Sequence, residues 1–327
     1  MATDIGYLHH VGHVVRDMER ALRVYRQLGF TCSLPAYPML ARMAGEQPVP
    51  LGAANAHAEF ARNFIEIMTV VTDTREMPAE ARLVELQVPP AARQRVLETA
   101  EQTVARIAVR LSRFEGLHRL VFQTADIEAT VARFDLNGVA HSGINVAQRE
   151  VETPTGVRVG PVRVLEIDSE DVAEGQLAVA DAPDGVQFSP HPNGALDLVE
   201  SILCVADSEI GDYIARYSRY LGRDAHRADS AWTFELQGSR LKVLPASALG
   251  SWLSGEAAPA VPMLAGYAVA VTDVDRARAL LEANGVPLRQ TPTGGIFVPA
   301  AFALGATVIF LPARAISACS PVHELVA

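Results

Sequence analysis

The sequence predicts an α+β protein built from four modules, each with the element order β-α-β-β-β. Three observations support this prediction. An apolar, strand-like run that ends on an aspartate occurs four times, and a helix-like stretch follows each aspartate. Three of the helix-like stretches end on a glycine followed by an apolar residue. A run rich in β-branched residues then closes each repeat, which is typical of a strand.

The four repeats align on their aspartates. A short acidic side chain at this place is a common helix N-cap. We therefore expect four helices, with Asp17 before 18–28, Asp126 before 127–137, Asp207 before 208–221 and Asp273 before 274–284. The second repeat is less regular than the first, because His118 lies one residue further from its aspartate than His10 lies from Asp17.

Each module is expected to end on a final strand. These strands are predicted at 63–71, 162–168, 240–245 and 306–312. An extra helix is predicted at about 89–114, between the first and second modules, because Pro89-Pro90 can begin it and apolar residues follow every three or four positions.

The composition of the chain suggests two domains. The Pro- and Gly-rich stretch 183–194 is the expected boundary. The N-terminal domain is predicted at 1–190, with modules at about 7–75 and 116–185. The C-terminal domain is predicted at 194–314, with modules at about 195–249 and 262–313, followed by a tail at 315–327.

Charge and targeting signals narrow the classes of partner. The net charge is -10 and no basic run occurs, which argues against nucleic acid as a partner. The N-terminus does not resemble a signal peptide and no long apolar run suggests a membrane span, so a cytoplasmic location without membrane contact is expected. The three cysteines fit no disulfide or zinc framework. A homodimer is a further possibility.

Four residues in the first two modules predict a metal site. His10 and His118 lie in the opening strands, and Glu66 and Glu166 lie in predicted closing strands at a similar distance along the chain. A glutamate flanked by apolar residues is costly to bury unless a cation balances it. Two imidazoles and two carboxylates suit a divalent ion such as Zn, Ni, Co, Mn or Fe. The alternative is that an arginine such as Arg62 or Arg163 balances a glutamate instead.

The last two modules lack these residues. Glu200 and Gly266 occupy the histidine positions, and Lys242 and Phe310 occupy the glutamate positions. We expect no metal site there. An ion pair between Glu200 and Lys242 is a hypothesis for what replaces it.

The fourfold repeat that opens on a strand with a histidine resembles the vicinal oxygen chelate superfamily, which includes glyoxalase I, extradiol dioxygenases and bleomycin-resistance proteins. The resemblance covers about residues 7–313 and is strongest at 8–30. It implies that modules pair so that their sheets curl into a cup, and that His10, Glu66, His118 and Glu166 bind the metal. It also implies a cup lined by residues around the following positions: Tyr37, Asn55, His57, Phe64, Met68, Phe122, His141 and Gln148.

Three functions follow from this resemblance, all on a small-molecule ligand. The first is a metal-dependent, glyoxalase-like isomerase, epimerase or lyase, in which Glu66 or Glu166 moves a proton beside a metal-bound oxygen. The second is an Fe(II) extradiol-type dioxygenase, which a site of two histidines and one carboxylate would suit. The third is a non-enzymatic binding or resistance protein, which is favoured if Glu66 and Glu166 are paired with arginines.

Overall fold

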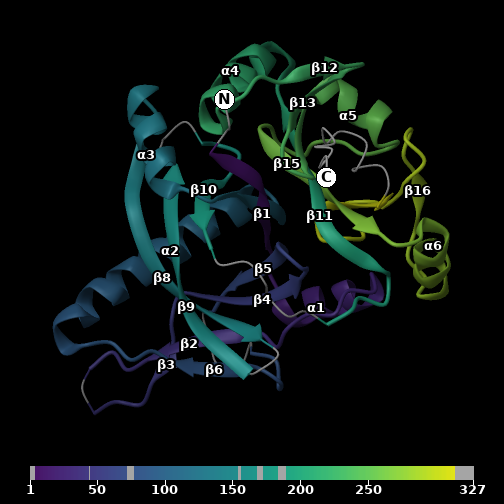
Figure 1. Cartoon of the computed structure of the whole chain (residues 1–327). Coiled ribbons are helices and arrows are strands. Elements are labelled where there is room, and N and C mark those ends of the chain that lie inside the picture. Colours follow the sequence, from purple (N-terminus) through teal and green to yellow (C-terminus); the bar gives the residue numbers. More distant parts are fainter. Residues whose placement is uncertain are drawn as a thin grey trace, which may run out of the picture.

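The computed structural model describes residues 4–43, 45–71, 77–153, 156–167, 172–182 and 189–313, with the backbone alone at 147–153 and 156–159. The predicted tail at 315–327 lies outside them. The purple-to-teal N-terminal half occupies the left and lower part of Figure 1, and the green-to-yellow C-terminal half lies at the upper right. In the described part of the chain, 18 strands and six α-helices form an open curled sheet with helices around it. The predicted α+β class is confirmed.

The N-terminal half contains two modules and a long inserted helix. The elements of the first module are β1 (Ile5–Val14), α1 (Met18–Gln27), β2 (Ala36–Leu40), β3 (Val49–Pro50), β4 (Ala53–Glu59), β5 (Phe64–Val70) and β6 (Arg82–Glu85). The insertion is a 3-10 turn (Pro90–Ala92) and α2 (Arg93–Arg113). The second module has β7 (Gly116–Thr124), α3 (Ile127–Leu136), β8 (His141–Thr153), β9 (Gly156–Ile167) and β10 (Gln176–Asp181).

The C-terminal half repeats this order in shorter form. Its first module has β11 (Ala195–Val205), a 3-10 turn (Asp207–Glu209), α4 (Ile210–Leu221), β12 (His226–Ala228), β13 (Ala231–Glu235), β14 (Arg240–Pro245) and α5 (Ala246–Trp252). Its second module has β15 (Met263–Val271), α6 (Val274–Ala283), β16 (Arg289–Gln290), β17 (Ile296–Val298) and β18 (Thr307–Pro312).

Three of the four aspartates cap helices as predicted. The carboxylate of Asp17 accepts a hydrogen bond from the backbone N–H of Arg20, and Asp126 and Asp273 do the same at α3 and α6. The prediction for Asp207 is wrong. A 3-10 turn precedes α4, and the Asp207 carboxylate instead accepts hydrogen bonds from the backbone N–H and the hydroxyl of Ser247 in α5.

The modules pair through their opening strands. β1 is antiparallel to β7, and β11 is antiparallel to β15. In each module the closing strand lies parallel to the opening strand: β5 beside β1, β10 beside β7, β14 beside β11 and β18 beside β15. The predicted closing strand of the second module is therefore wrong. The segment at 162–168 belongs to β9, which forms a hairpin with β8, and β10 is the strand parallel to β7.

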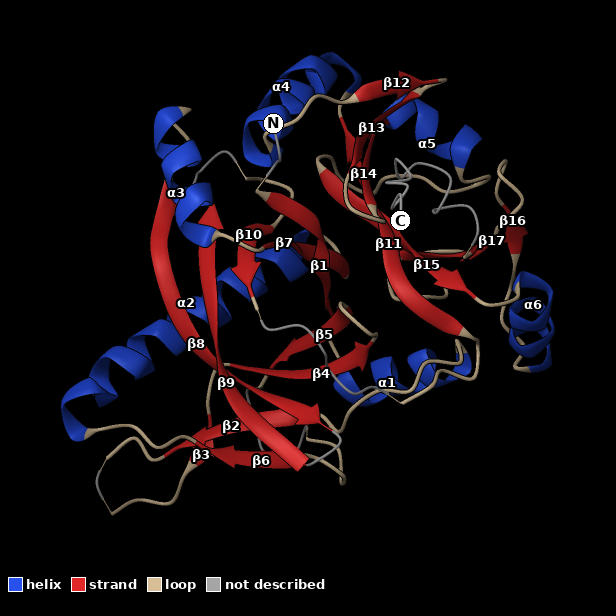
Figure 2. Cartoon of the chain, in the orientation of Figure 1, coloured by secondary structure: helices blue, strands red, loops and turns tan. Residues whose placement is uncertain are grey.

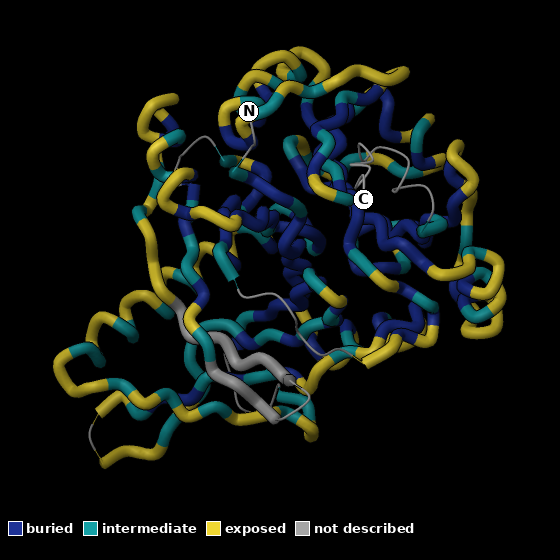
Figure 3. The backbone as a smooth tube through the Cα atoms, viewed as in Figure 1, coloured by how far each residue is buried: buried dark blue, intermediate teal, exposed yellow. Residues whose placement is uncertain are grey.

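The two halves share one hydrophobic core. Figure 3 shows buried backbone concentrated where the halves meet and exposed backbone on the outer helices. Residues of all four modules contribute to one buried cluster, among them Val11, Phe122, Leu198 and Val269. Asn63 adds polar contacts, because its side-chain amide donates to the Leu198 carbonyl (2.9 Å) and its side-chain oxygen accepts from the Leu198 N–H (2.9 Å).

The inserted helix α2 connects both halves. It is the long helix at the left of Figure 2, and the 3-10 turn before it begins at Pro90, close to the predicted start. Its buried residues Ile107 and Leu111 pack against Val14 and Met68 of the first module. Phe114, at its C-terminal end, packs in an apolar cluster of the C-terminal half.

Candidate functional site

The candidate site lies on one face of the N-terminal sheet, which we call the N-terminal cup. It is the face of β1, β4, β5, β7, β9 and β10 that carries His10, Glu66, Arg119, Gln176 and Glu166. Gly12 of β1 is opposite Glu66 of β5 on one side and opposite Arg119 of β7 on the other. Glu66 and Arg119 therefore face each other across a glycine.

Gly12 makes this approach possible. A Cβ atom at Gly12 would lie only 2.6 Å from the Cβ atom of Arg119 and 3.3 Å from its Cδ atom. The Arg119 side chain thus passes directly over the glycine to reach Glu66, and a larger residue would displace it.

Glu66 is a buried carboxylate with charged and polar neighbours. The Arg119 guanidinium donates to it at 2.6 Å, and the side-chain amide of Asn55 donates at 3.1 Å. The Nε2 atoms of His10 and His57 lie 3.7 and 3.9 Å from its oxygens. Burial alone would raise the pKa of Glu66, but Arg119 and the two histidines hold it well below its usual range.

A chain of polar contacts continues from Arg119 to Glu166. The Nε and Nη2 atoms of Arg119 donate to the Gln176 side-chain oxygen at 2.9 and 2.7 Å. The Gln176 amide donates to Glu166. Arg106 of α2 lies 3.8 Å from the other Glu166 oxygen. Gln176 thus links the two glutamate sites, and the sequence prediction missed both Gln176 and Arg119.

His118 does not join this cluster. Strand alternation places it on the opposite face of β7 from Arg119. It is fully buried, its ring stacks on Phe114 at 4.3 Å, and its Nε2 atom donates to the Phe114 carbonyl oxygen at 3.0 Å. Burial lowers the pKa of His118 to about 4, so the imidazole is neutral at pH 7.

The structure brings together His10, Glu66 and Glu166 around Arg119, but not the four predicted ligands around one point. Among the described residues, no group of three or more His, Cys, Asp or Glu side chains is placed to hold a metal ion. The arginine that balances Glu66 is Arg119. Arg62 instead pairs with Asp197 (2.7 Å), and Arg163 pairs with Asp181 and Glu128.

The repeat alignment contains a signal for Arg119. Counted back from the N-cap aspartates, Arg119 is at the position of His10. By strand register, Ala178 is the counterpart of Glu66 in the second module, since it is opposite Val121 as Glu66 is opposite Gly12. Glu166 is next to Ala178 on the neighbouring strand, as His57 is next to Glu66.

The predicted lining is partly on this face. Asn55, His57, Phe64 and Met68 lie on β4 and β5 with Glu66. Tyr37 and Phe122 are instead fully buried in the core cluster shared by the modules. His141 hydrogen-bonds to Asp135 beside α3, and the side chain of Gln148 is outside the described residues.

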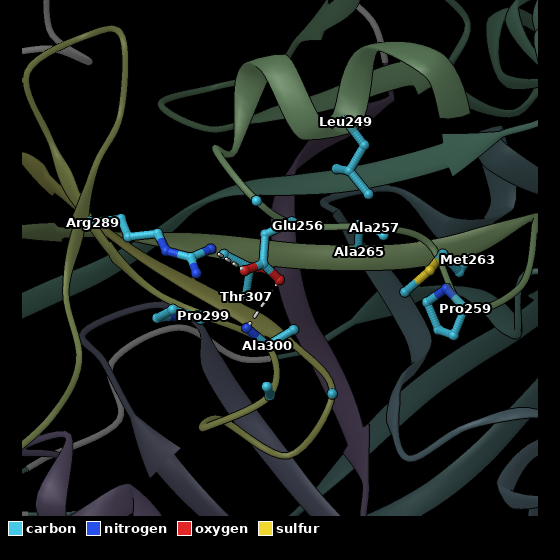
Figure 4. Close-up of a pocket in the computed structure, with 13 residues that line it drawn as sticks. Leu249, Glu256, Ala257, Pro259, Met263, Ala265, Arg289, Pro299, Ala300 and Thr307 are labelled. Atoms are coloured by element: carbon cyan, nitrogen blue, oxygen red, sulfur yellow. Dashed lines mark hydrogen bonds and ion pairs between the residues drawn. The ribbon is translucent and has the colours of Figure 1, made fainter.

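In the first module of the C-terminal half, ion pairs take the corresponding positions. Glu200 is fully buried and contacts Lys242 (3.0 Å) and Arg240, as hypothesised for the Lys242 pair. Helix α5 adds Leu249 to the apolar cluster on this face. A cavity of about 330 Å³ remains between α5, β15 and the loop at 299–305, where Glu256 accepts hydrogen bonds from Ala300 and Arg289 (Figure 4).

The sequence matches one protein family over most of its length. The model of the glyoxalase-like domain matches residues 8–221, which is more than half of the chain and includes the whole N-terminal cup. This chain belongs to the glyoxalase-like domain family. The predicted relationship to the vicinal oxygen chelate superfamily is therefore confirmed. No protein with a curated description matches the sequence.

Solved structures share the fold of this glyoxalase-like protein at low identity. A hypothetical protein from Staphylococcus aureus has a TM-score of 0.57 at 13% identity, over 94% of this chain and 100% of that one. A mutant 4-hydroxymandelate synthase from Streptomyces coelicolor has a TM-score of 0.55 at 12% identity, over 96% and 97%. The Mn(II)-bound glyoxalase from Novosphingobium aromaticivorans has a TM-score of 0.51 at 13% identity, over 94% and 82%.

Within the ranges that the structure describes, no helix of this glyoxalase-like protein combines the length and the apolar character needed to cross a bilayer.

Proposed function

We propose that the N-terminal cup binds a small organic molecule around the Arg119–Glu66 pair, without the predicted four-residue metal centre. The observation that carries this proposal is the 2.6 Å contact between the Arg119 guanidinium and the buried Glu66 carboxylate. Asn55 and Gln176 hold the pair in place. Several polar groups that converge and are held by hydrogen bonds are typical of small-molecule sites.

The predicted donor set does not fit a single metal ion. His118 is on the opposite face of β7, bonded to the Phe114 carbonyl oxygen. A divalent cation bound to Glu66 would also lie beside the positive guanidinium of Arg119, which would repel it. We therefore assign the binding of the ligand to side chains of the cup and derive no step through a metal.

A metal-dependent glyoxalase-like isomerase, epimerase or lyase is the second candidate. It is favoured by the two imidazoles near Glu66, His10 at 3.7 Å and His57 at 3.9 Å, because imidazole and carboxylate are common ligands of divalent metals. Glu66 or Glu166 would then move the proton. Oxygen uptake in the presence of Fe(II) and a catechol would instead indicate the dioxygenase.

Substitution of Gly12 tests whether the cup is the binding site. Gly12→Ala places a methyl group 2.6 Å from the Arg119 Cβ atom, so β1 or Arg119 must shift, and we expect this shift to disturb the Arg119–Glu66 contact. We expect a loss of about 1–3 kcal/mol of stability from overpacking. We also expect weaker binding of every small molecule that raises the melting temperature of the unmodified protein in a thermal-shift screen.

Gly211→Ala is the matched control. A Cβ atom at Gly211, on the exposed side of α4, meets no atom within 4 Å. This variant should bind the same molecules as the unmodified protein. Unchanged binding in folded Gly12→Ala would mean that the ligands bind outside the N-terminal cup.

Elemental analysis separates the two candidates. Protein that is incubated with Mn(II), Zn(II), Ni(II), Co(II) or Fe(II) and then desalted should retain no stoichiometric metal if Arg119 takes the place of a ligand. One ion per chain that is lost on Glu66→Gln substitution would instead support the metal-dependent enzyme.

A further inference from the structure

We propose that the molecule in the N-terminal cup is a small organic acid, whose carboxylate or phosphate oxygens bind the guanidinium groups of Arg106, Arg110 and Arg119. This inference rests on the proposed function and specifies the chemical class of the ligand.

Helix α2 places two of these arginines over the cup. Arg106 and Arg110 are one helical turn apart and therefore lie on one side of α2. Their neighbours Ile107 and Leu111 pack against Val14 and Met68, which orients this part of the helix toward the sheet. Arg106 lies 3.8 Å from Glu166, which fixes its position next to the polar chain of the cup.

Three guanidinium groups gather at the cup. They are those of Arg106, Arg110 and Arg119, and the carboxylates on this face are Glu66, Glu166 and Glu59, which lies 3.7 Å from His57. Arg119 forms an ion pair with Glu66. Glu166 accepts a hydrogen bond from Gln176 and lies near Arg106. The guanidinium of Arg110 makes no hydrogen bond or ion pair to any described residue. Glu166 attracts Arg110 at longer range, so Arg110 is the guanidinium of the three that has no direct carboxylate contact within the described ranges.

The positive charges of Arg106 and Arg119 also repel the Arg110 guanidinium. Burial, followed by repulsion from Arg119 and Arg106, lowers the pKa of Arg110 to about 10, although attraction by Glu166 opposes this shift. A partly buried cation in this situation is stabilised by an added anion. The planar fork of a guanidinium matches the two oxygens of a carboxylate or phosphate, so an organic acid is the ligand that these three arginines would recognise.

Matched acid and neutral probes test the inference by calorimetry. Benzoate is compared with benzamide, and phenyl phosphate with phenol, at millimolar concentration and low salt. We expect at least one acid to bind about tenfold or more tightly than its neutral analogue, and added salt to weaken the acid alone. The pair that responds distinguishes a carboxylate site from a phosphate site.

Variants of α2 provide the controls. Arg110→Met should weaken binding of the acid about tenfold or more, and Arg110→Lys should weaken it less, because it keeps the charge but loses the fork. Arg95→Met removes an exposed arginine of the same helix and should have no effect. The inference is overturned if neither acid binds, if the neutral analogue binds equally well, or if Arg110→Met behaves like Arg95→Met.

The two proposals fail in different ways. If neutral molecules bind and are lost in Gly12→Ala, but no acid depends on Arg110, the cup is the ligand site and the inference on organic acids is wrong. If an acid depends on Arg110 yet binds equally well to Gly12→Ala, the anion site stands and the Arg119–Glu66 pair is not its centre.

Discussion

Arg119 and Gly12 show how a small residue can determine the position of a large one. The register of β1 and β7 places them opposite each other, and the missing side chain of Gly12 lets the guanidinium reach Glu66. His118, one position earlier, points into the core instead. Neighbouring residues of one strand thus have separate roles, with His118 in packing and Arg119 in the polar site.

The buried position of His118 predicts a pH dependence of stability. Its pKa is about 4 in the folded chain and near the ordinary value of 6.5 when unfolded, so only the unfolded state takes up a proton between these values. Well above pH 6.5, His118 is neutral in both states and contributes nothing to the pH dependence. As the pH falls toward 4, it lowers the free energy of unfolding by up to about 1.4 kcal/mol per pH unit.

Urea denaturation of His118→Gln between pH 4 and pH 7 isolates this effect, because other buried histidines are present in both proteins. The stability difference between His118→Gln and the unmodified protein should shift in favour of the variant as the pH falls. His226→Gln, at an exposed histidine, is the matched control for the substitution itself. Parallel profiles for His118→Gln and the unmodified chain would contradict a neutral, buried His118.

Elements formed by local contacts were predictable from the sequence, and those formed by distant contacts were not. The helices after Asp17, Asp126 and Asp273 follow from a cap and a terminating glycine within a few residues. The closing strand of the second module does not follow in this way. β9 and β10 are both apolar, and only their pairing with β8 and β7 identifies which one is parallel to the opening strand.

The candidate site was likewise predictable only as far as local sequence determines it. The apolar surroundings of Glu66 indicated a buried carboxylate that needs a positive partner, and the sequence correctly placed it in a closing strand. The identity of the partner depends on a contact between β5 and β7, which are separated by α2 in the sequence. His118 was predicted because it is a histidine like His10. Arg119, however, is the residue that aligns with His10 when the N-cap aspartates are superposed.

The cap of α1 provides a test at the level of one element. Asp17→Ala removes the acceptor for the Arg20 N–H and should lower the free energy of unfolding by about 1 kcal/mol, measured by urea denaturation. Asp17→Ser retains an acceptor and should recover most of this loss. A loss of the same size in both variants would show that the carboxylate charge, and not the capping hydrogen bond, is what matters.

The molecule as a whole is expected to unfold as one unit. Residues from both halves share a buried cluster, and Asn63 binds the backbone of Leu198 across the junction. Both tryptophans, Trp232 and Trp252, lie in the C-terminal half, so their fluorescence reports on that half alone. The fluorescence and far-ultraviolet circular dichroism transitions in urea should therefore coincide.

Asn63→Ala tests the coupling from the other half. It leaves the N–H and carbonyl of Leu198 without these side-chain partners and should cost about 2 kcal/mol or more. The tryptophan transition should shift to lower urea even though the change is in the first module. Asn137→Ala, at an exposed residue with a local contact to Arg133, should shift it little. Separate transitions of the two halves would contradict a shared core.

Helix α2 contacts both halves of the protein. Arg106 lies beside the polar chain of the N-terminal cup. Phe114, at the C-terminal end of α2, packs in the apolar cluster that also contains Leu249 of α5, the helix that ends at Trp252. The helix cannot tilt away from the cup without moving that aromatic anchor. A tilt of α2 on ligand binding would therefore displace Phe114, and we expect the fluorescence of Trp252, in the neighbouring helix α5, to report it.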